Sequence, residues 1–438
     1  MSVDSLAFKR LQSLFDDGVF TEMDRFGNES VVAGYGMVNG TPCCAFSQNV
    51  ESDGAAMTAK QAEKIGKAYD LAEKIGCPVV GIYDSNGGKL SDGMDAVCAY
   101  SELIASADRL SGVVPQVSIV AGTCAASAAV WAQCADIVIM ADSGELFVTA
   151  PSLLGDDVGN AKTAVKNGTA HIACKTDFDA VSSARDILSF LPSNNISCPA
   201  ECDCVPPVGA FPAKDASSAV AAVCDEGSVV ELRKEFGSDS ITAFGRIAGS
   251  SVGVVAAYGV LNVDDCSKIA SFVGVCDAYS IPVVTIVDTE GYETTVDSEL
   301  DGNVKAASVL TKAYANATTV KIALISGKAY GPAFMTFAGK SSGADTVLAM
   351  NNAVISPLAP EAAATIIYND RILAGEDKQV VLSEYLANDA SAQVAASKGI
   401  IDDVVTAEDV YAKILCSLDI LASKRVTTLD KKHVVLSF

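Results

Sequence analysis

Four short glycine-bearing segments carry the residue types that could do chemistry in this sequence. In the first half they are Asp84–Lys89 (Asp-Ser-Asn-Gly-Gly-Lys) and Gly122–Ala128, and in the second half Asp288–Tyr292 and Gly327–Ala333. Glycine and alanine let a ligand approach the backbone closely, and free N–H groups at a helix start can hold a developing oxyanion. The segments therefore indicate oxyanion stabilisation by backbone amides, although buried turns packed beside a sheet have the same composition.

Residues suited to side-chain acid–base or metal chemistry are scarce by comparison. The sequence contains two histidines, His171 and His433, which argues against histidine-based triads, HExxH zinc sites and most histidine-ligated metals. Cys198, Cys202 and Cys204 are closely spaced, but they lack a fourth partner at zinc-like spacing, so we interpret them as free thiols in a linker. We expect no metal bound by this chain.

The charge balance excludes one class of partner. The 438 residues include 31 Lys and Arg against 54 Asp and Glu, which gives a formal net charge of −23. Nucleic-acid binding depends on Lys and Arg that neutralise phosphates. We therefore expect no nucleic-acid partner.

Alternating helices and buried strands must position these segments. Residues 59–75 have apolar positions at helical spacing and lead into a β-branched run that ends at Asp84. A second helix near 96–107 leads into a strand over 113–122, and a small-residue helix start is followed by a strand over 137–140. Strands that are apolar throughout and alternate with helices are typical of parallel sheets in α/β proteins.

The same order of segments occurs twice. Asp84 and Asp288 lie 204 residues apart, and Gly122 and Gly327 lie 205 apart, each pair within similar apolar runs. Such nearly constant spacing indicates an internal duplication. We place the two domains at residues 1–215 and 216–438, with a linker rich in Pro and Cys at 197–216.

The sequence also bears on cellular location. The N-terminus has no basic region followed by an apolar one, so we expect no signal peptide. The apolar window Val117–Ala141 is long enough to span a membrane, but it contains Gln133 and Asp136, and its small residues favour a buried strand–helix–strand. We expect a cytoplasmic protein.

At these residues the chain resembles a known family, the carboxyltransferase subunits of biotin-dependent acyl-CoA carboxylases and decarboxylases. Residues 84–89 are similar to a DSGGAR turn, and the most specific matches are the LPSNN segment within 188–195 and the Lys-Ala-Tyr-Gly turn at 328–331. Further matching segments are 10–16, 114–118, 168–171, 241–249, 399–403 and 431–433. The resemblance implies two tandem crotonase-like (ClpP/crotonase) β-β-α spiral domains related by the duplication.

The resemblance also implies a mechanism. Carboxybiotin on another protein releases CO2, the biotin ureido group removes the α-proton of an acyl-CoA, and CO2 adds to the enolate. One oxyanion hole in the N-terminal domain faces the thioester oxygen, with Gly87 and Gly88 as donors by position. The other, in the C-terminal domain, faces the biotin oxygen, with Gly291, Gly331 and Ala333 as counterparts.

Further residues are assigned to substrate binding on the same resemblance, and some depart from the family pattern. Ala126 and Ser127 line the turn next to the first oxyanion hole, and Lys89, Tyr292 and Tyr330 complete the set. Ala126-Ser127 replaces a usual pair of glycines, and Pro332, which has no N–H, replaces another. Asn86 and Lys89 stand in place of a usual Gly and Arg. An altered substrate or a loss of activity would each explain these departures.

The family implies cofactors and partners outside this chain. The sequence contains neither a Met-Lys-Met biotinylation motif nor a phosphate-binding P-loop. We therefore expect biotin on a separate biotin carboxyl carrier protein, a biotin carboxylase or a membrane decarboxylase subunit as partner, and a homo-oligomer, a hexamer built from dimers.

Two alternative functions stay open. One is the alpha subunit of a sodium-pumping decarboxylase for methylmalonyl-CoA or glutaconyl-CoA, which would place the chain at the periphery of a membrane complex. The other is a catalytically silent scaffold subunit of such a complex.

Other conspicuous residues have structural interpretations. We expect His171 in hydrogen-bonded structure rather than as a base, Trp131 in the core, and the acidic run 294–301 in solvent. The Lys-Lys-His433 tail either contacts CoA phosphates or is solvated.

Overall fold

The computed structural model describes residues 5–26, 29–155 and 157–429. The chain divides into two compact units. Unit 1 comprises Met1–Ala200 with Arg233–Phe236, and unit 2 comprises Glu201–Leu232 with Gly237–Phe438.

Unit 1 is built on a mixed sheet with the strand order β1-β2-β3-β4-β5-β7-β9. The first three strands, which are antiparallel, are β1 (Phe20–Glu22), β2 (Val31–Val38) and β3 (Thr41–Gln48). The strands that continue from β3 in parallel are β4 (Val79–Tyr83), β5 (Gln116–Val120), β7 (Ile137–Ala141) and β9 (Ile172–Cys174). A separate parallel pair is formed by β6 (Thr123–Ala125) and β8 (Glu145–Phe147).

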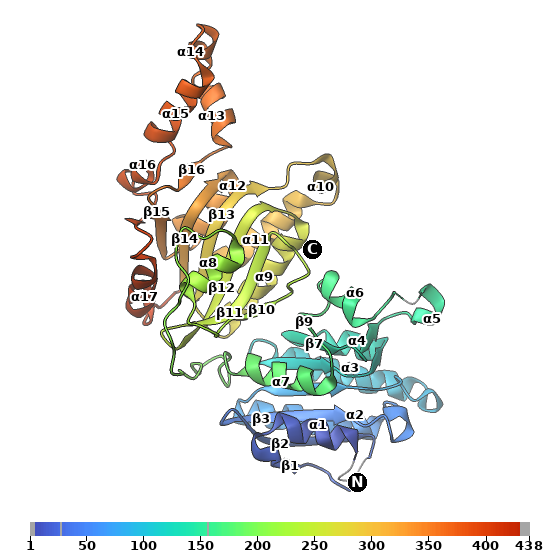
Figure 1. Ribbon diagram of the computed structural model, residues 1–438. Helices are drawn as coiled ribbons and strands as arrows, with labels where there is room; N and C mark the ends of the chain where they lie inside the picture. Colours follow the sequence, from blue (N-terminus) through green and yellow to red (C-terminus); the bar gives the residue numbers. More distant parts are fainter. Residues whose placement is uncertain (1–4, 27–28, 156, 430–438) are drawn as a thin grey trace. The chain divides into compact units, whose positions relative to one another are not determined.

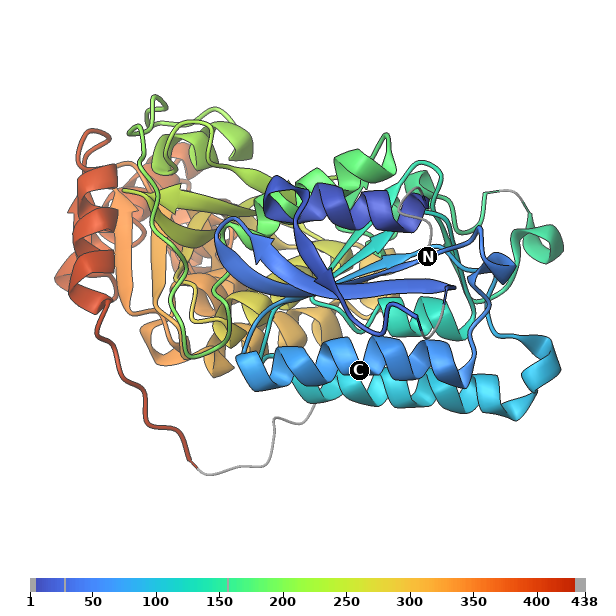
Figure 2. The ribbon, with the colours of Figure 1, turned by 90° about the horizontal axis from the view of Figure 1, so that it is seen from below.

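Helices cover both faces of this sheet (Figure 2). One face carries α2 (Ala59–Ile75) and α3 (Met94–Leu110), which lie side by side, and the other carries α1 (Leu6–Leu14) and α7 (Asp177–Leu188). The predicted helix at 59–75 is thus confirmed: Thr58 caps its N-terminus by accepting the Gln61 N–H, and Gly76 ends it in the left-handed conformation.

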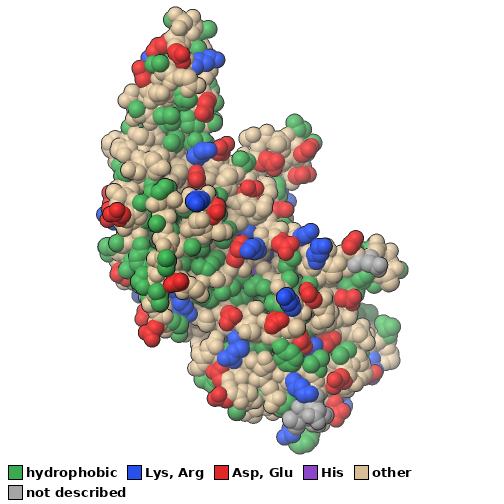
Figure 3. All heavy atoms as spheres, viewed as in Figure 1, with side chains coloured by type: hydrophobic (Ala, Val, Ile, Leu, Met, Phe, Trp, Pro, Cys, Tyr) green, Lys and Arg blue, Asp and Glu red, His purple; other side chains and the backbone are tan. Residues whose placement is uncertain are grey.

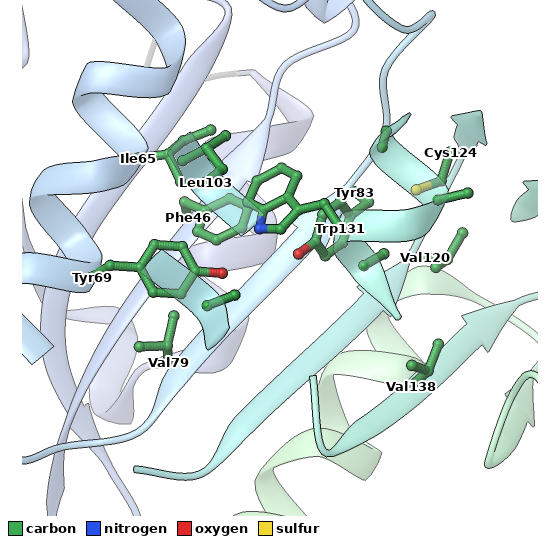
Figure 4. Close-up of a cluster of buried hydrophobic side chains, with 14 of the residues drawn as sticks. Phe46, Ile65, Tyr69, Val79, Tyr83, Leu103, Val120, Cys124, Trp131 and Val138 are labelled. Carbon is green, nitrogen blue, oxygen red and sulfur yellow. The ribbon is translucent and has the colours of Figure 1, made fainter. Parts of the chain in front are cut away.

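An aromatic cluster fixes the short helix α4 (Ser127–Ala132) to the sheet (Figure 4). The Trp131 ring stacks on Phe46 of β3 with centroids 5.2 Å apart, and meets Tyr83 of β4 edge-on at 4.8 Å. Trp131 is 1% exposed, which confirms its expected place in the core. Because these contacts hold α4 against β3 and β4, they also hold the turn that begins α4.

Unit 2 repeats the topology, with the strand order β10-β11-β12-β13-β14-β15-β17 (Figure 1). Its antiparallel strands are β10 (Val230–Leu232), β11 (Ser240–Ile247) and β12 (Ser250–Leu261). The strands that follow β12 in parallel are β13 (Val283–Tyr292), β14 (Lys321–Tyr330), β15 (Thr346–Met350) and β17 (Asp403–Val405). Its principal helices are α8 (Ala216–Val223), α9 (Val263–Ala278), α11 (Asn303–Asn316), α12 (Gly331–Ala338) and α17 (Val410–Leu421).

The pairing pattern confirms the duplication. In both units three antiparallel strands are followed by four parallel ones in the same order. The end of β14 pairs in parallel with β16 (Val354–Ser356), as β6 pairs with β8 in unit 1. The predicted α/β class is therefore also confirmed.

Other expectations about segments are confirmed as well. The apolar window 117–141 forms a strand, a short helix and a strand, and none of the helices in the described ranges is long and apolar enough to cross a membrane. Residues 201–215 contain neither helix nor strand. Acidic side chains gather over α10 (Val296–Leu300) in Figure 3, and most residues of the run 294–301 are exposed.

A helical arm of unit 2 was not foreseen from the sequence. It contains α13 (Pro360–Ile367), α14 (Asn369–Leu373), α15 (Lys378–Asn388) and α16 (Ala392–Ser397). Figure 1 shows α13, α14 and α15 extending beyond the sheet of unit 2. The arm has a small core of its own around Val381 and Tyr385.

A buried ion-pair network ties the first helix to the sheet of unit 1. The Arg10 guanidinium of α1 donates to Asp84 at the end of β4 through Nη1 at 2.9 Å, and to Asp177 of α7 through Nε at 2.7 Å. Arg10 is 3% exposed and Asp84 8% exposed. Arg10 therefore joins three elements at the strand end that carries the first glycine turn.

We expect the Arg10→Ala substitution to lower the free energy of unfolding by about 3–5 kcal/mol, because it leaves the buried Asp84 carboxylate without its partner. Urea unfolding followed by circular dichroism measures this change. Arg109→Ala is the matched control: Arg109 pairs with Asp70 and Glu73 at the surface, so its loss should cost less than about 1 kcal/mol. Equal effects of the two substitutions would contradict a central role for Arg10.

Candidate active site

The first glycine turn follows β4 and is organised by a serine hydroxyl. Ser85 is fully buried, and its Oγ accepts the Gly87 N–H at 3.1 Å while donating to the Ala55 carbonyl at 2.7 Å. Gly87 has a φ of 100°, a conformation that side chains rarely adopt. The Gly87 N–H is thus engaged within the turn.

The Asp84 carboxylate joins the ends of β4 and β5. A Cβ at Gly122, the residue that follows β5 by two positions, would lie 2.0 Å from Asp84 Oδ1. Gly122 must therefore be glycine because the carboxylate occupies the space of a side chain. The Asp84 N–H in turn donates to Gln48 Oε1 of β3 at 3.2 Å.

The second turn of unit 1 begins α4 in a strained conformation. Ala126 has φ 52° and ψ −117°, a combination typical of glycine. Its N–H donates to the Phe147 carbonyl of β8 at 2.8 Å, which holds the residue in place. Ser127 then opens the helix, and no side chain caps this end.

Of these unit 1 residues, Gly88 and Ser127 offer the available amides. Within the described ranges no partner is found for the Gly88 N–H, and Ser127 lies in the first turn of α4, where helix amides lack partners inside the helix. The Ser85 N–H donates to the Thr123 carbonyl at 2.8 Å, so the segment that follows β4 lies directly beside the segment that leads into α4. The structure therefore brings the two predicted turns of unit 1 to one place.

Unit 2 builds the equivalent turn after β13 with a threonine. Thr289 Oγ1 accepts the Gly291 N–H at 3.1 Å and donates to the Gly259 carbonyl at 2.8 Å. Gly291 has a φ of 116°. As in unit 1, an aspartate precedes the hydroxyl residue: a Cβ at Gly327 would lie 2.2 Å from Asp288 Oδ1, which accepts the Lys328 N–H at 2.8 Å.

The second turn of unit 2 begins α12. Gly331 has a φ of 49°, and a Cβ there would lie 2.9 Å from the Pro357 carbonyl oxygen. Pro332 follows in the first helical turn, and no side chain caps this end. Because proline has no N–H, Ala333 supplies the next backbone amide of the first helical turn, where helix amides lack partners inside the helix.

The predicted substrate-binding side chains are engaged in internal contacts. Tyr292 ties β13 to α12 through a 2.9 Å hydrogen bond with Thr336, and burial raises the pKa of Tyr292 to about 12, so it stays protonated. Burial also raises the pKa of Tyr330. The Lys89 ammonium pairs with Asp53 at 2.8 Å near the surface.

His171 is structural, as expected. Its Nδ1 accepts the Val138 N–H at 3.0 Å, and the backbone N–H of His171 donates to the Val138 carbonyl at 2.8 Å. Burial, with a smaller effect from Arg233, holds the pKa of His171 well below its usual range. His433 lies outside the described residues.

In the described ranges, no three His, Cys, Asp or Glu side chains are grouped so that they could hold a metal ion. Cys198, Cys202 and Cys204 are exposed free thiols.

The glycine turns on a duplicated α/β fold match a known class. The family model described as "Carboxyl transferase domain" matches residues 2–436. The chain therefore belongs to the carboxyl transferase family, and its crotonase-like fold is confirmed by transcarboxylase 12S, with a TM-score of 0.94 at 29% identity over 99% of this chain and 92% of that one. That structure is described as a hexamer with hydrolysed methylmalonyl-coenzyme A bound.

Curated relatives narrow the type. The methylmalonyl-CoA decarboxylase alpha subunit of Propionigenium modestum is 34% identical over 98% of this chain and 92% of its own length. The propionyl-CoA carboxylase beta chain of Saccharopolyspora erythraea is 33% identical over 98% of this chain and 89% of its own. The chain is thus an enzyme subunit, a carboxyltransferase of this type, as the sequence predicted.

Sequence reasoning missed the residues that shape the turns. Ser85 and Thr289 were not singled out, although they lie 204 residues apart in equivalent positions and both carry a hydroxyl. This shared residue type was a readable signal. The roles assigned to individual glycines and tyrosines remain predictions.

We expect Ala126→Gly to raise the free energy of unfolding by about 1 kcal/mol, because it relieves a backbone conformation that alanine adopts only under strain. Ala128→Gly, two residues along in the helix, should instead lower it by about 1 kcal/mol. Chemical denaturation of both variants measures the two signs. Destabilisation by both would contradict strain at Ala126.

Acidification should destabilise the protein in part through His171. The folded protein holds the His171 imidazole neutral, whereas the imidazole of the unfolded chain takes up a proton near pH 6.5. The free energy of unfolding should therefore fall as the pH drops below that value, by at most about 1.4 kcal/mol per pH unit. His171→Asn keeps an acceptor for the Val138 N–H but cannot titrate. Urea midpoints at pH 7 and pH 5 should therefore differ less in the variant, and an unchanged difference would contradict this role.

Proposed function

We propose that this carboxyltransferase moves a carboxyl group between carrier-bound biotin and a small acyl-CoA, as part of an acyl-CoA carboxylase. The observation that carries the proposal is the repetition of one device: each unit presents a hydroxyl-ordered glycine turn beside an uncapped helix start. A carboxyl transfer through an enolate develops negative charge on two oxygens, one on each reactant, and two sets of amides suit that need.

The residues of the turns fit these two reactants. In the N-terminal domain, which we assign to residues 1–215, the Gly88 and Ser127 amides would hold the thioester oxygen. In the C-terminal domain, residues 216–438, amides around Gly291, Gly331 and Ala333 would hold the ureido oxygen. Carboxybiotin supplies the CO2 and the proton acceptor.

The carboxylates at the turns favour this division of labour. Asp84 is paired with Arg10, and Asp288 accepts the Lys328 N–H. Both carboxylates thus make structural contacts and are not free to act as a general base, so a base supplied by one of the reactants is consistent with the site. His171 is committed to Val138 in the same way.

The relatives support a short acyl group. Methylmalonyl-CoA and propionyl-CoA stand in the names of the two curated relatives, and methylmalonyl-coenzyme A was bound in hydrolysed form to transcarboxylase 12S. The decarboxylase relative is a specific reason to keep a second candidate, the alpha subunit of a sodium-pumping decarboxylase. The scaffold alternative has weaker support, because Pro332 removes one amide of α12 but leaves that of Ala333.

The proposed setting follows the family. We assign the chain to the cytoplasm, with a biotin carboxyl carrier protein and a biotin carboxylase, or a membrane decarboxylase subunit, as partners. Six copies of the 45.0 kDa chain would form a hexamer of about 270 kDa. The hexamer described for transcarboxylase 12S supports this assembly.

A transfer assay tests the function. Labelled carboxyl exchange between biotin, free or on a carrier, and acetyl-, propionyl-, methylmalonyl- or glutaconyl-CoA should proceed with at least one acyl-CoA. No exchange and no acyl-CoA binding would favour the scaffold alternative.

Within this assay, Gly87→Val should lower turnover roughly a hundredfold, because valine cannot keep the turn at positive φ and the Gly88 donor loses its alignment. Gly40→Val is the matched control, because Gly40 also has a positive φ, 73°, and open space around a Cβ. Gly40 lies in the hairpin between β2 and β3, so the turnover of this variant should stay near that of the unmodified enzyme. Equal losses in both variants would show a general effect of strain.

A further inference from the structure

The two turns share more than a glycine: they share one hydrogen-bonding scheme, residue for residue. Ser85 and Thr289 lie 204 positions apart, as do their acceptors Ala55 and Gly259 and the glycines Gly87 and Gly291. The hydroxyl-to-carbonyl distances are 2.7 and 2.8 Å, and both glycine N–H distances are 3.1 Å. Neither hydroxyl is reachable from solvent, since Ser85 and Thr289 are fully buried.

These hydrogen bonds fix the direction of the amide that follows each glycine, which in unit 1 is the Gly88 N–H. In unit 1 the Gly87 carbonyl accepts the Met57 N–H at 2.8 Å, and the Lys89 N–H donates to the Met57 carbonyl at 3.0 Å. In a trans peptide the C=O and the N–H point in opposite directions. Because the Gly87 carbonyl faces Met57, the Gly88 N–H faces away from it, toward the partly exposed side of the turn.

Unit 2 has the same arrangement. Leu261 pairs with Tyr292 as Met57 pairs with Gly88, and the Glu293 N–H donates to the Leu261 carbonyl at 2.9 Å. The amide equivalent to that of Gly88 is therefore that of Tyr292. In each unit the hydroxyl group fixes the turn through two hydrogen bonds. It accepts the N–H of the glycine two residues later, Gly87 or Gly291, and it donates to the carbonyl of Ala55 or Gly259.

We propose that Ser85 and Thr289 are equivalent positioning residues, which aim the Gly88 and Tyr292 amides at the two oxygens that become charged during carboxyl transfer. The proposal rests on the proposed function. It assigns no bond-making step to either hydroxyl: each acts through the glycine that it holds.

The substitutions that test it remove or exchange the hydroxyls. Ser85→Ala and Thr289→Val remove them, whereas Ser85→Thr and Thr289→Ser keep the hydroxyl and exchange the residue types of the two repeats. Ser118→Ala and Thr285→Val are matched controls, because both remove a buried hydroxyl group that lies away from the turns. Ser118 lies on β5, the neighbour of β4, and Thr285 lies on β13, the strand that also carries Thr289. Thr285 bonds to the Tyr314 hydroxyl instead.

Three measurements on the full-length enzyme are needed: kcat and KM in the carboxyl exchange assay, acyl-CoA affinity by calorimetry, and hydrogen–deuterium exchange of the peptides that contain Gly87 and Gly291. Ser85→Ala should lower kcat about tenfold to a hundredfold, because a transition-state donor loses its alignment. Its acyl-CoA affinity should change less than about threefold. Amide exchange should accelerate in the Gly87 peptide alone, since the acceptor of that N–H is gone.

Thr289→Val should behave in the same way at the Gly291 peptide, and the losses in kcat should multiply in the double variant, because the two hydroxyls serve separate turns. Ser85→Thr and Thr289→Ser should recover most of the activity. The controls should keep kcat within about threefold and leave both peptides unchanged.

Several results would overturn the proposal. Unchanged kcat and unchanged amide exchange in Ser85→Ala would do so, as would failure of Ser85→Thr to recover activity when it restores slow exchange at Gly87. A loss of kcat in the controls equal to that in the turn variants would reduce the effect to general packing. If the unmodified enzyme transfers no carboxyl group, the proposed function fails first, and the exchange data alone then report the geometry of the turns.

Discussion

A carboxylate at the end of a strand organises both units, and it has to be compensated where it is buried. Asp84 and Asp288 each occupy the space that a side chain would take at Gly122, just after β5, and at Gly327 of β14. Unit 1 compensates Asp84 with the Arg10 guanidinium, whereas Asp288 is half-exposed and accepts a backbone N–H. Burying an ion pair is costly unless its hydrogen bonds are satisfied. Arg10 offsets that cost by pairing with both Asp84 and Asp177, and it fixes the strand end from which the first glycine turn departs.

Much of this fold could be predicted from the sequence. The repeat at a spacing of 204, the helix at 59–75 and the strand that ends before Asp84 all follow from patterns that are local, or that recur. The pairing of Arg10 with Asp177 is not legible, because 167 residues separate them and no periodicity links them. The arm from α13 to α16 was missed for a related reason: the equivalent interval of unit 1, between β8 and β9, contains only the two short helices α5 (Pro151–Leu154) and α6 (Ala161–Lys166).

The candidate site shows the same division. The sequence alone indicated the glycine turns, because each of them follows an apolar run that predicts a buried strand. It could not tell which amide is free, since that depends on partners such as Ser85 Oγ and the Phe147 carbonyl. Gly87 and Ala126 were expected at the site, yet both donate inward, and their neighbours Gly88 and Ser127 present the available N–H groups. The N–H groups of two successive residues in these turns point in opposite directions, and the residue types alone do not show which of the two points outward.

The position of Arg10 has a consequence for the order of events during synthesis. Arg10 is synthesised 74 residues before Asp84 and 167 residues before Asp177. At the usual rate of about 5–20 residues per second, the first helix would wait several seconds or more for its last partner. During that interval α1 can pack against β2 and β3, which follow it closely in the chain, but the Arg10 guanidinium lacks its second carboxylate. The contact between α1 and α7 should thus be among the last to form in unit 1, although α1 precedes every other helix of that unit in the chain.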